Sequence, residues 1–332
     1  MSPSRTIKRI EMSKEKNEVS LANNLFNAFE KLESEIGKTV IGQKDVVRLL
    51  ITSIFCGGHS LLVGVPGLAK TLLVHSISNS LGLDYNRIQF TPDLMPSDVL
   101  GAETLDQERN LRFIKGPVFA NVILADEINR TPPKTQSALL EAMQEGSVTI
   151  GGKHYKLDKP FFVLATQNPI EQEGTYPLPE AQLDRFMFMI NLDYPSLNEE
   201  LEIVKKTTTG IVEQTNKVLS KEEIIEYQQL VRKVPVADNV FDYAVNLVYK
   251  TRPGSDHASD ESNEFLEWGA GPRASQFLIL GAKCNALLNG KYSPDIEDVK
   301  AVSKPILRHR IVRNFKAEAE GITEEAIIER LL

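Results

Sequence analysis

Between residues 41 and 192, short apolar runs alternate with stretches of helical periodicity. The apolar runs are HSLLVG, YNRIQF, NVILAD, FFVLAT and FMFMINL. Several of them are apolar almost throughout, which is typical of parallel strands covered by helices on both faces. The alternation therefore predicts an α/β fold in which helices flank a parallel sheet.

Three segments between these runs predict further elements. TPPKTQSALLEAMQEG predicts a helix in which Thr131 is the N-cap, Pro132 occupies the first helical position and Gly146 ends the helix. SVTIGGKHYKL, which follows directly, predicts a hairpin around Gly151 and Gly152. GAETLDQERNLRFIKG predicts another hairpin or loop, inserted before the NVILAD strand.

The pattern changes near residues 193–199, where strand-like runs stop and helical patterns take over. The stretch RPGSDHASDESNEFLEW interrupts these helices and predicts an exposed loop. We therefore expect three parts: an N-terminal tail or leading helix at 1–24, an α/β core at 25–195, and a smaller, all-helical domain at 196–332.

Composition narrows the classes of function. The 332 residues are 42% hydrophobic and 25% charged, so the chain can bury a sizeable core. The net charge of −7 argues against a broad nucleic-acid-binding surface, although it leaves a local basic channel open. Cys56 and Cys284 lie far apart in sequence, and we expect both to be buried apolar residues. The five histidines lack ligand spacing, so a metal held by protein side chains alone is not expected.

No segment predicts membrane insertion. The N-terminal stretch MSPSRTIKRIEMSKEKNEVS is polar and lacks the apolar core of a signal peptide. The most apolar stretch, VVRLLITSIFCGGHSLLVGV, is interrupted by Arg48, the Gly57-Gly58 pair and His59, so it predicts a helix followed by a strand. We therefore expect a cytoplasmic protein.

The stretch GVPGLAKT nearly fits the phosphate-binding pattern G-x-x-x-x-G-K-[ST] and lies between a predicted strand and a predicted helix. In that arrangement, backbone N–H groups and the helix dipole bind phosphate. Lys70 would neutralise the terminal phosphates, and the Thr71 hydroxyl would bind Mg²⁺. The candidate nucleotide-binding residues here are Gly64, Val65, Pro66, Gly67, Leu68, Ala69, Lys70, Thr71 and Leu72. Taken alone, the motif fits a structural turn equally well.

Ala69 stands where the pattern has its second glycine. We expect residue 69 to have a negative φ at the start of the helix. A methyl group costs little there, and alanine favours helix more than glycine does. A larger side chain would crowd the phosphates.

The apolar run NVILAD ends in a pair of acidic residues, Asp126 and Glu127. A carboxylate at the C-terminal end of a parallel strand points into the crevice where ligands bind. Asp126 could hold Mg²⁺ through water, and Glu127 could orient and deprotonate an attacking water. A capping or surface acidic pair is the alternative, but the phosphate-loop candidate upstream favours a functional site.

Three further residues have weaker support. Asn168 ends the VLATQNP strand, where its amide could hold the hydrolytic water, although asparagine before proline is also a routine turn former. Arg185 in PEAQLDRF carries a planar fork suited to phosphate oxygens, although without further context a surface salt bridge is favoured. Arg273 in GAGPRASQ lies in the first turn of a predicted helix, where a cation opposes the helix dipole.

Taken together, these segments resemble the MoxR family of AAA+ ATPases over nearly the whole chain. The resemblance is carried by GVPGLAKT, LADEINRTPPKTQSALLEAMQEG, ATQNP, GTYPLPEAQLDRF and GPRAS. Alanine before the loop lysine is itself common in that family, so Ala69 supports the resemblance. The resemblance implies a P-loop AAA+ core followed by a helical lid domain, and an ATPase that uses ATP and Mg²⁺.

The resemblance also implies a role for each candidate. The implied roles are Walker A for Gly64, Gly67, Lys70 and Thr71, Walker B for Asp126 and Glu127, sensor 1 for Asn168, the arginine finger for Arg185, sensor 2 for Arg273, and the adenine border for Val40 and Ile41. Inserts within roughly 95–118 and at 147–157 would face the pore of a ring or the substrate.

Members of the family are similar to chaperones that mature, remodel or activate other protein complexes, often with von Willebrand factor A domain proteins as partners. The resemblance implies a homo-oligomeric ring, usually a hexamer, with no nucleic acid as partner. Two alternatives stay open. A metal-chelatase motor subunit shares the ATPase core and the helix insert. A nucleic-acid motor is disfavoured by the acidic balance and by the lack of a helix-turn-helix signal.

Overall fold

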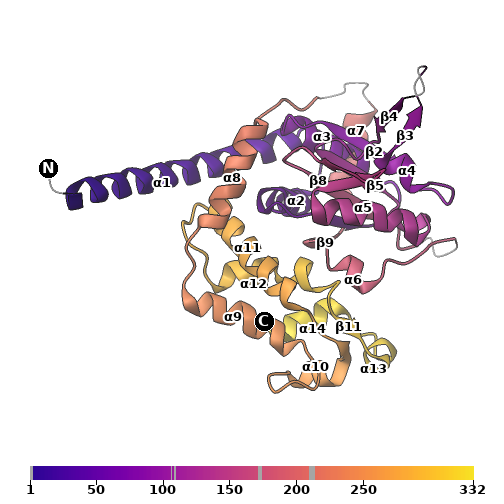
Figure 1. Cartoon of the computed structure of the whole chain (residues 1–332). Coiled ribbons are helices and arrows are strands. Elements are labelled where there is room, and N and C mark those ends of the chain that lie inside the picture. Colours follow the sequence, from indigo (N-terminus) through magenta and orange to yellow (C-terminus); the bar gives the residue numbers. More distant parts are fainter. Residues whose placement is uncertain (1–2, 106, 108–109, 171–173, 209–213) are drawn as a thin grey trace. The chain divides into compact units, whose positions relative to one another are not determined.

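The structure is a computed structural model that describes residues 3–105, 107, 110–170, 174–208 and 214–332. Its backbone contacts divide the chain into two compact units. One contains residues 33–221 and 308–310, and the other contains residues 1–32, 222–307 and 311–332. Figure 1 shows both units and labels helices and strands of each. Among the described residues, no helix is long and apolar enough to cross a membrane.

The first unit, hereafter the α/β unit, is built on a five-stranded parallel sheet with the order β2-β5-β8-β1-β9. Its strands are β1 Ser60–Val63, β2 Tyr85–Gln89, β5 Val122–Asp126, β8 Phe162–Gln167 and β9 Phe188–Asn191. Each predicted apolar run is one of these strands. The prediction of a parallel α/β sheet is therefore confirmed.

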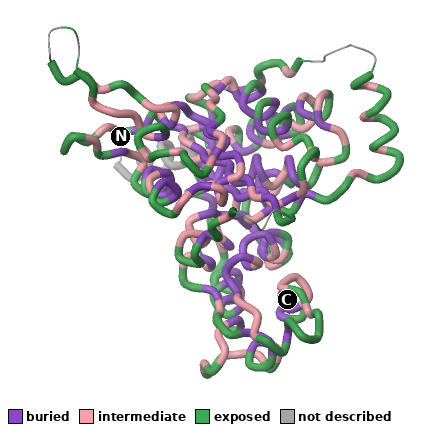
Figure 2. Tube along the Cα trace, turned by 90° about the vertical axis from the view of Figure 1, so that its right-hand side faces the viewer, coloured by how far each residue is buried: buried purple, intermediate pink, exposed green. Residues whose placement is uncertain are grey.

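Helices cover the sheet because the strands are apolar on both faces. The helices of this unit are α2 Lys44–Cys56, α3 Lys70–Ser80, α4 Pro96–Leu100, α5 Pro133–Glu145, α6 Glu180–Leu183 and α7 Leu197–Thr207, with a 3₁₀ turn η1 at Ile128–Arg130. On one face, Leu61 and Ile123 belong to a fully buried cluster with Leu139 of α5. Their neighbours Leu62 and Leu124 point to the opposite face and are also fully buried. Figure 2 shows this buried interior in purple.

Helix α5 begins one residue later than predicted. Its N-cap is Pro132 and its first residue is Pro133, whereas Thr131 is buried and its Oγ1 donates to the carbonyl of Thr91 at 2.6 Å. The expectation that Thr131 caps the helix is wrong, because two consecutive prolines extend the residue before them. Gly146 ends the helix with a φ of 59°, as predicted.

Both predicted hairpins are present. One pairs β3 Gly101–Leu105 with β4 Leu111–Lys115, and the other pairs β6 Ser147–Ile150 with β7 Lys153–Lys156. Residues 106 and 108–109 of the first hairpin lie outside the described residues. The rings of Phe113 and Tyr155 lie 4.2 Å apart, so the two hairpins pack against each other.

The second unit, hereafter the helical unit, carries most of the C-terminal part of the chain. Its elements are the first part of α1 Pro3–Ile36, then α8 Lys221–Lys233, α9 Asp238–Lys250, α10 Asp260–Phe265, α11 Pro272–Leu288, α12 Ile296–Leu307, α13 Phe315–Ala319 and α14 Glu324–Leu331. A short antiparallel pair, β10 Leu266–Trp268 with β11 Val312–Arg313, is the one departure from the all-helical expectation among the described residues. Strands of two and three residues are too short to produce an alternating pattern.

The segment from residue 252 to 268 is more ordered than the exposed loop that its composition predicts. It contains α10 and β10, and the side chains of Phe265 and Leu266 are buried. Ser259 caps α10 by accepting a hydrogen bond from the backbone of Ser262 at 3.0 Å. Polar residues that cap and turn a short helix resemble loop residues in sequence.

The compact units divide the chain at other positions than the expected borders at 24/25 and 195/196. Helix α1 runs without a break through residues 24 and 25. At the second border, residues after α7 pack on the α/β unit: the backbone of Val218 donates to the carbonyl of Ser80 at 2.7 Å, and Lys221 pairs with Asp84 at 3.0 Å.

Candidate active site

Three neighbouring strands of the α/β unit carry the sequence candidates at one edge of the sheet. The order β5-β8-β1 places the acidic pair, Asn168 and the GVPGLAKT loop after adjacent parallel strands. The register aligns Val63 with Gln167 and Ala125 with Ala165, so the three strands end at nearly the same level. The C-terminal edge of a parallel sheet is where α/β proteins bind ligands.

The loop between β1 and α3 has little side-chain bulk at its base and none at its tip. The backbone N–H of Gly64 donates to the carbonyl of Gln167 at 3.2 Å. A Cβ on Gly64 would lie 2.9 Å from the Cβ of Leu192, so the base of the loop has no room for a side chain. Gly67 has a φ of 88°, and no atom lies within 4 Å of the position of its absent Cβ. The tip therefore needs glycine for its backbone conformation.

The conformation of Ala69 overturns the expectation of a negative φ at this position. Ala69 is the N-cap of α3 with a φ of 53° and a ψ of 27°, which is the left-handed region. Its methyl group therefore costs about 1 kcal/mol relative to glycine. The residue is exposed, so the strain comes from the backbone and not from crowding.

Lys70 and Thr71 begin helix α3 and lie beside this loop. The Nζ atom of Lys70 donates a hydrogen bond to the carbonyl of Gly64, so the lysine folds back across the loop. Thr71 and Leu72 are exposed in the first turn of α3, which contains no acidic side chain. An exposed helix N-terminus with a lysine beside it is an anion-binding environment.

The far end of β1 is fixed by a half-buried histidine whose ring nitrogens face the protein interior. Nδ1 of His59 accepts from the backbone of Val163 at 3.0 Å, so its Nε2 carries the proton that is donated to the carbonyl of Met143 at 3.1 Å. Burial lowers the pKa of His59 to about 4. The imidazole is therefore neutral at pH 7 and ties β1 to β8 and to the end of α5.

Asp126 is almost completely buried, and both of its carboxylate oxygens have partners. Oδ1 accepts from the hydroxyl of Thr166 at 2.6 Å. Oδ2 accepts from Nε of Arg87 at 3.0 Å and from Nη2 of the same residue at 2.6 Å. A guanidinium that binds one oxygen through two nitrogens fixes the orientation of the carboxylate.

Glu127 has the same left-handed backbone as Ala69 but many more partners. Its φ is 55°, and its backbone N–H donates to the hydroxyl of Thr166 at 2.9 Å. Its Oε2 accepts from Gln89 at 2.8 Å and from Arg130 at 3.0 Å. Strained backbone at a strand end is typical of functional sites, and here several hydrogen bonds hold it in place.

The partners of the acidic pair were not among the sequence candidates. Arg87 and Gln89 lie on β2, whose register aligns Gln89 with Asp126, and Thr166 lies on β8. The available signal was the polar residues at alternate positions of an otherwise strand-like run, which place both side chains on one face. Their contacts with residues 38 and 39 positions away depend on the strand order, which the sequence pattern does not contain.

Asn168 follows β8 between the loop and the acidic pair, and it is 5% exposed. Its Oδ1 accepts from the backbone N–H of Ile170 at 3.1 Å. This contact is that of the turn former considered from the sequence. The residue also lies at the strand end beside the phosphate-loop candidate, which is the position required of a residue that touches a bound phosphate.

Arg185 lies at the opposite edge of the sheet from the loop. It precedes β9, and the backbone of its neighbour Met187 donates to the carbonyl of His59 at 2.7 Å, at the start of β1. The GVPGLAKT loop follows the other end of β1, a strand of four residues, and is therefore roughly 13 Å farther along the strand direction.

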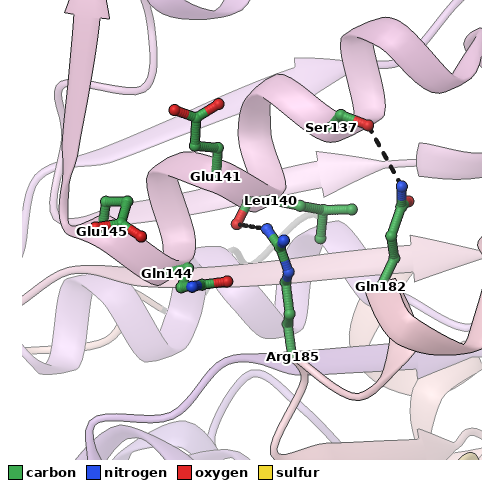
Figure 3. Close-up of a pocket in the computed structure, with 7 residues that line it drawn as sticks. All are labelled: Ser137, Leu140, Glu141, Gln144, Glu145, Gln182 and Arg185. Atoms are coloured by element: carbon green, nitrogen blue, oxygen red, sulfur yellow. Dashed lines mark hydrogen bonds between the residues drawn. The ribbon is translucent and has the colours of Figure 1, made fainter.

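The side chain of Arg185 projects toward helix α5, as Figure 3 shows. Its Nη1 donates to the carbonyl of Leu140 at 2.6 Å. It lines a cavity of about 350 Å³ whose other lining residues are Ser137, Leu140, Glu141, Gln144, Glu145 and Gln182. The guanidinium is only partly buried, so it is accessible at the surface of this unit.

The remaining candidates have different surroundings. Val40 is buried and Ile41 half-buried just after the end of α1, and the backbone of Val40 donates to the carbonyl of Ile36 at 2.9 Å. Arg273 belongs to the helical unit, where it is half-buried in the first turn of α11 behind Pro272. The structure thus places the loop, the acidic pair and Asn168 at one edge of the sheet in the α/β unit, with Arg185 at the far edge.

The donor set at the loop edge suits a nucleotide with a magnesium ion. The loop supplies exposed backbone, Lys70 a cation, and Thr71 an exposed hydroxyl at the start of α3. Asp126 supplies a carboxylate, and oxygen atoms are the ligands that Mg²⁺ prefers. No group of three or more histidine, cysteine or acidic residues among the described residues could hold a metal without such a ligand.

Comparisons with known proteins follow the same division of the chain. Residues 59–188 match the family model described as "ATPase family associated with various cellular activities (AAA)". Residues 259–331 match the model described as "AAA lid domain". Arg273 lies in the second match, and the loop and both carboxylates lie in the first.

Individual relatives extend the likeness to nearly the whole chain. Chaperone MoxR1 of Mycobacterium tuberculosis is 42% identical over 308 residues, covering 92% of this chain and 81% of that protein. The uncharacterized protein YeaC of Bacillus subtilis is 42% identical over 304 residues, covering 91% and 92%. A crystal structure of a protein assigned as an ATPase, from Cytophaga hutchinsonii, has a TM-score of 0.89 and 44% identity and covers 97% of both chains.

Proposed function

This chain belongs to the MoxR family of AAA+ ATPases, and we propose that it couples ATP hydrolysis to the remodelling, maturation or activation of a client protein complex. The chemistry of hydrolysis is assigned below to individual residues of the α/β unit. A von Willebrand factor A domain protein is the partner class to test first.

Nucleotide binding is assigned to the β1–α3 loop. The backbone of residues 64–69 and the start of α3 would surround the phosphates, and Lys70 would leave the carbonyl of Gly64 to pair with them. Val40 and Ile41 are proposed to border the adenine. When bound, Mg²⁺ would neutralise charge on the terminal phosphates, with the hydroxyl of Thr71 and the carboxylate of Asp126 as its protein-side partners.

Proton abstraction from the attacking water is assigned to Glu127. Its carboxylate lies one residue beyond β5, and Gln89 and Arg130 orient it. A general base must lie within hydrogen-bond reach of the water that it activates, and an amide at Asn168 would hold that water from the neighbouring strand. Arg273, in the first turn of α11, is proposed as the sensor of the helical unit.

The position of Arg185 is the observation that carries the oligomeric part of this proposal. It lies at the edge of the sheet opposite its own loop, so its guanidinium cannot serve the phosphates bound there. In a head-to-tail ring, each subunit presents one edge to the next subunit. We therefore assign Arg185 to the nucleotide of a neighbouring subunit in a ring, with a hexamer as the expected size.

An arginine supplied by a neighbour is worth roughly 10³–10⁵ in rate. The variant Arg185→Ala should therefore lose turnover by at least about 10³-fold while it retains its affinity for a fluorescent ATP analogue. The measurement is steady-state ATP hydrolysis beside a fluorescence titration. Normal turnover in this variant would remove Arg185 from the mechanism.

The client proposal is tested by trapping. The Glu127→Gln variant should hold ATP without hydrolysing it, so a client bound in the ATP state would stay attached. Affinity capture with Glu127→Gln and ATP is compared with the same capture using Lys70→Ala, which should bind no nucleotide. A protein enriched only in the first capture, and released by wild-type turnover, supports remodelling. Identical captures would contradict an ATP-dependent client.

A further inference from the structure

Arg310 is fully buried and binds the segment that carries Arg185. Its side chain is 1% exposed. Its Nε donates to the carboxylate of Asp184 at 2.7 Å, and its Nη2 donates to the carbonyls of Asp184 at 2.9 Å and Phe186 at 2.6 Å. Its Nη1 donates to the carbonyl of Met187 at 3.3 Å. The acceptors therefore lie on both sides of Arg185 in the chain.

The same segment receives a second buried contact from His309. Arg310 Nη1 lies 2.8 Å from Nε2 of His309, and that nitrogen lies 3.1 Å from the carbonyl of Phe186. Nε2 of a neutral imidazole can accept from Arg310 in one tautomer or donate to the carbonyl of Phe186 in the other, so His309 makes one of these two hydrogen bonds. Burial and the charge of Arg310 hold the pKa of His309 well below its usual value.

A rigid, multiply bonded arginine constrains backbone in a way that a lysine does not. The guanidinium presents its donors in a fixed plane, so the carbonyls of Asp184, Phe186 and Met187 must take up positions that match it. A buried charge without these acceptors would be strongly destabilising, so the acceptors and the arginine hold one another. The backbone on either side of Arg185 is therefore fixed, while the Arg185 guanidinium itself stays accessible.

We propose that Arg310 is a positioning residue that sets the direction in which Arg185 leaves the protein surface. This proposal rests on the assignment of Arg185 to a neighbouring subunit. Arg310 itself is buried and touches no nucleotide. It acts by fixing the backbone from which the Arg185 side chain extends. Misplacement of a catalytic group by about 1 Å can cost roughly 10²-fold in rate, so the placement of that backbone matters for turnover.

Residues 308–310 also connect this segment to the helical unit along the chain. They belong to the α/β unit, yet they lie in sequence between α12, which ends at Leu307, and β11, which begins at Val312. The element that fixes the Arg185 segment is thus covalently continuous with the helical unit on both sides. A change in the helical unit that displaces residues 308–310 would therefore also displace the backbone beside Arg185.

The variant Arg310→Lys keeps the positive charge but loses the planar guanidinium and its several hydrogen-bond donors. We expect kcat for ATP hydrolysis to fall by about 10- to 100-fold, with the KM for ATP changed by less than about twofold, because the nucleotide loop is untouched. Asp184→Asn is a milder second variant, since it weakens the bond to Nε and leaves the three carbonyl acceptors. It should lower kcat in the same direction by a smaller factor. Normal kcat in both variants would overturn the proposal.

The matched control is Arg313→Lys. Arg313 is also an arginine of the C-terminal segment with several partners, namely Glu324 at 2.8 Å and the carbonyl of Ile322 at 3.0 Å. Its partners belong to the helical unit, as does Arg313 itself, and not to residues 184–187. Its conservative replacement should leave kcat within about twofold of the wild type, which separates loss of an arginine fork in general from loss of this one.

Rings mixed from two variants test whether the Arg310→Lys defect lies in the arginine that a subunit contributes to its neighbour's site. Glu127→Gln subunits cannot hydrolyse their own ATP but keep Arg185 and Arg310. Mixed in equal amounts with Arg310→Lys subunits, they should restore hydrolysis to about one quarter of the wild-type rate, because one pairing in four joins an intact site to an intact arginine. The same mixture made with Arg185→Ala subunits is the reference.

The outcomes separate the two proposals. Recovery with both Arg185→Ala and Arg310→Lys supports the positioning role. Recovery with Arg185→Ala but not with Arg310→Lys places the Arg310 defect in its own subunit's site or fold and overturns the positioning role alone. Failure of the Arg185→Ala mixture removes the assignment of Arg185 to a neighbour, and the role of Arg310 falls with it.

Discussion

The turn after β1 and the turn after β5 each place a residue other than glycine in the left-handed region, and they hold it by different means. Ala69 has a φ of 53° and is exposed, with only a methyl group as side chain. Glu127 has a φ of 55°, but Thr166, Gln89 and Arg130 bind its backbone and its carboxylate. The first strain could be relieved by glycine without loss of a functional group.

The second strain cannot be relieved in this way, because the carboxylate itself is the group that the chemistry requires. The β5 turn is therefore held in place by hydrogen bonds to Glu127, whereas the side chain of Ala69 in the β1 loop can make none. In the structure Lys70 binds the loop's own carbonyl at Gly64. Preorganised polar groups cost no rearrangement at the moment of reaction, so this division suits a base and a phosphate-binding loop.

Loss of the carboxylate at the β5 turn should have the largest effect. Glu127→Gln keeps the size and the hydrogen-bonding capacity of the side chain but removes the base. We expect kcat to fall by about 10²- to 10⁴-fold with the affinity for ATP retained. Steady-state hydrolysis and a nucleotide titration measure the two quantities. Glu200→Gln, at an exposed position on α7, is the control and should behave as wild type. If Glu127→Gln turned over normally, the β5 turn would be preorganised for some other purpose.

Replacement of His59, which fixes the start of β1, should have the next largest effect. The quantity affected is the free energy of unfolding and its dependence on pH. The folded protein lowers the pKa of His59 from 6.5 to about 4, so the unfolded chain takes up the proton first as the pH falls. This contribution to stability is fully present above pH 6.5 and is lost between 6.5 and about 4, to a total of roughly 3 kcal/mol.

Urea unfolding at several pH values tests the His59 prediction. His59→Gln should be less stable than wild type at pH 7 and should lose less stability on acidification than wild type does. His154→Gln, at an exposed position on β7, is the control. Equal pH slopes in wild type and His59→Gln would show that the anchor does not depend on a neutral imidazole.

Removal of the cation beside Asp126 should have a smaller effect. Arg87 pairs with one oxygen of Asp126, and its own side chain is 46% exposed, so solvent screens the pair. Arg87→Gln should lower the Mg²⁺ concentration that supports nucleotide binding by a few-fold, because Arg87 no longer competes with Mg²⁺ for Asp126. The interaction free energy of an exposed ion pair is at most about 1 kcal/mol, which limits the size of this effect. The readout is a Mg²⁺ titration of fluorescent ATP analogue binding, with Arg112→Gln as control. A higher Mg²⁺ requirement would mean that Arg87 orients Asp126 more than it competes.

The smallest effect is expected at the β1 loop. Ala69→Gly should stabilise the loop conformation by about 1 kcal/mol at most, because glycine enters the left-handed region without a penalty. Ala69→Val should do the opposite and by more, since a branched side chain tolerates that region poorly. Thermal unfolding and ATP affinity should shift in the same order, Gly above Ala above Val. An unchanged series would show that the loop leaves this conformation when it binds nucleotide.

Much of the α/β unit could be predicted from the pattern of the chain. The five strands, both hairpins and the end of α5 at Gly146 follow from local periodicity and turn residues, which act over a few positions. The loop and the acidic pair were found because each forms a contiguous motif. The start of α5 was misplaced because Thr131 had a partner elsewhere, the carbonyl of Thr91.

The contacts that hold the candidate site could not be predicted in the same way. Arg87 and Asp126 are 39 residues apart, and Arg310 and Asp184 are 126 residues apart. Such pairs depend on strand order and on the return of residues 308–310 to the α/β unit, neither of which leaves a local signature. The left-handed Ala69 escaped prediction because a single alanine gives no indication of its φ.

Residues 308–310 belong to the α/β unit although the residues on both sides of them belong to the helical unit. This arrangement affects how the C-terminal region can be exchanged between related proteins. The helical unit is not one uninterrupted stretch of chain, because it leaves for three residues and comes back. A graft of the C-terminal region from a relative would bring a foreign histidine and arginine pair against the host's 184–187 turn. Chimaeras should therefore work best when donor and host agree at both segments, and evolution would be expected to exchange them together.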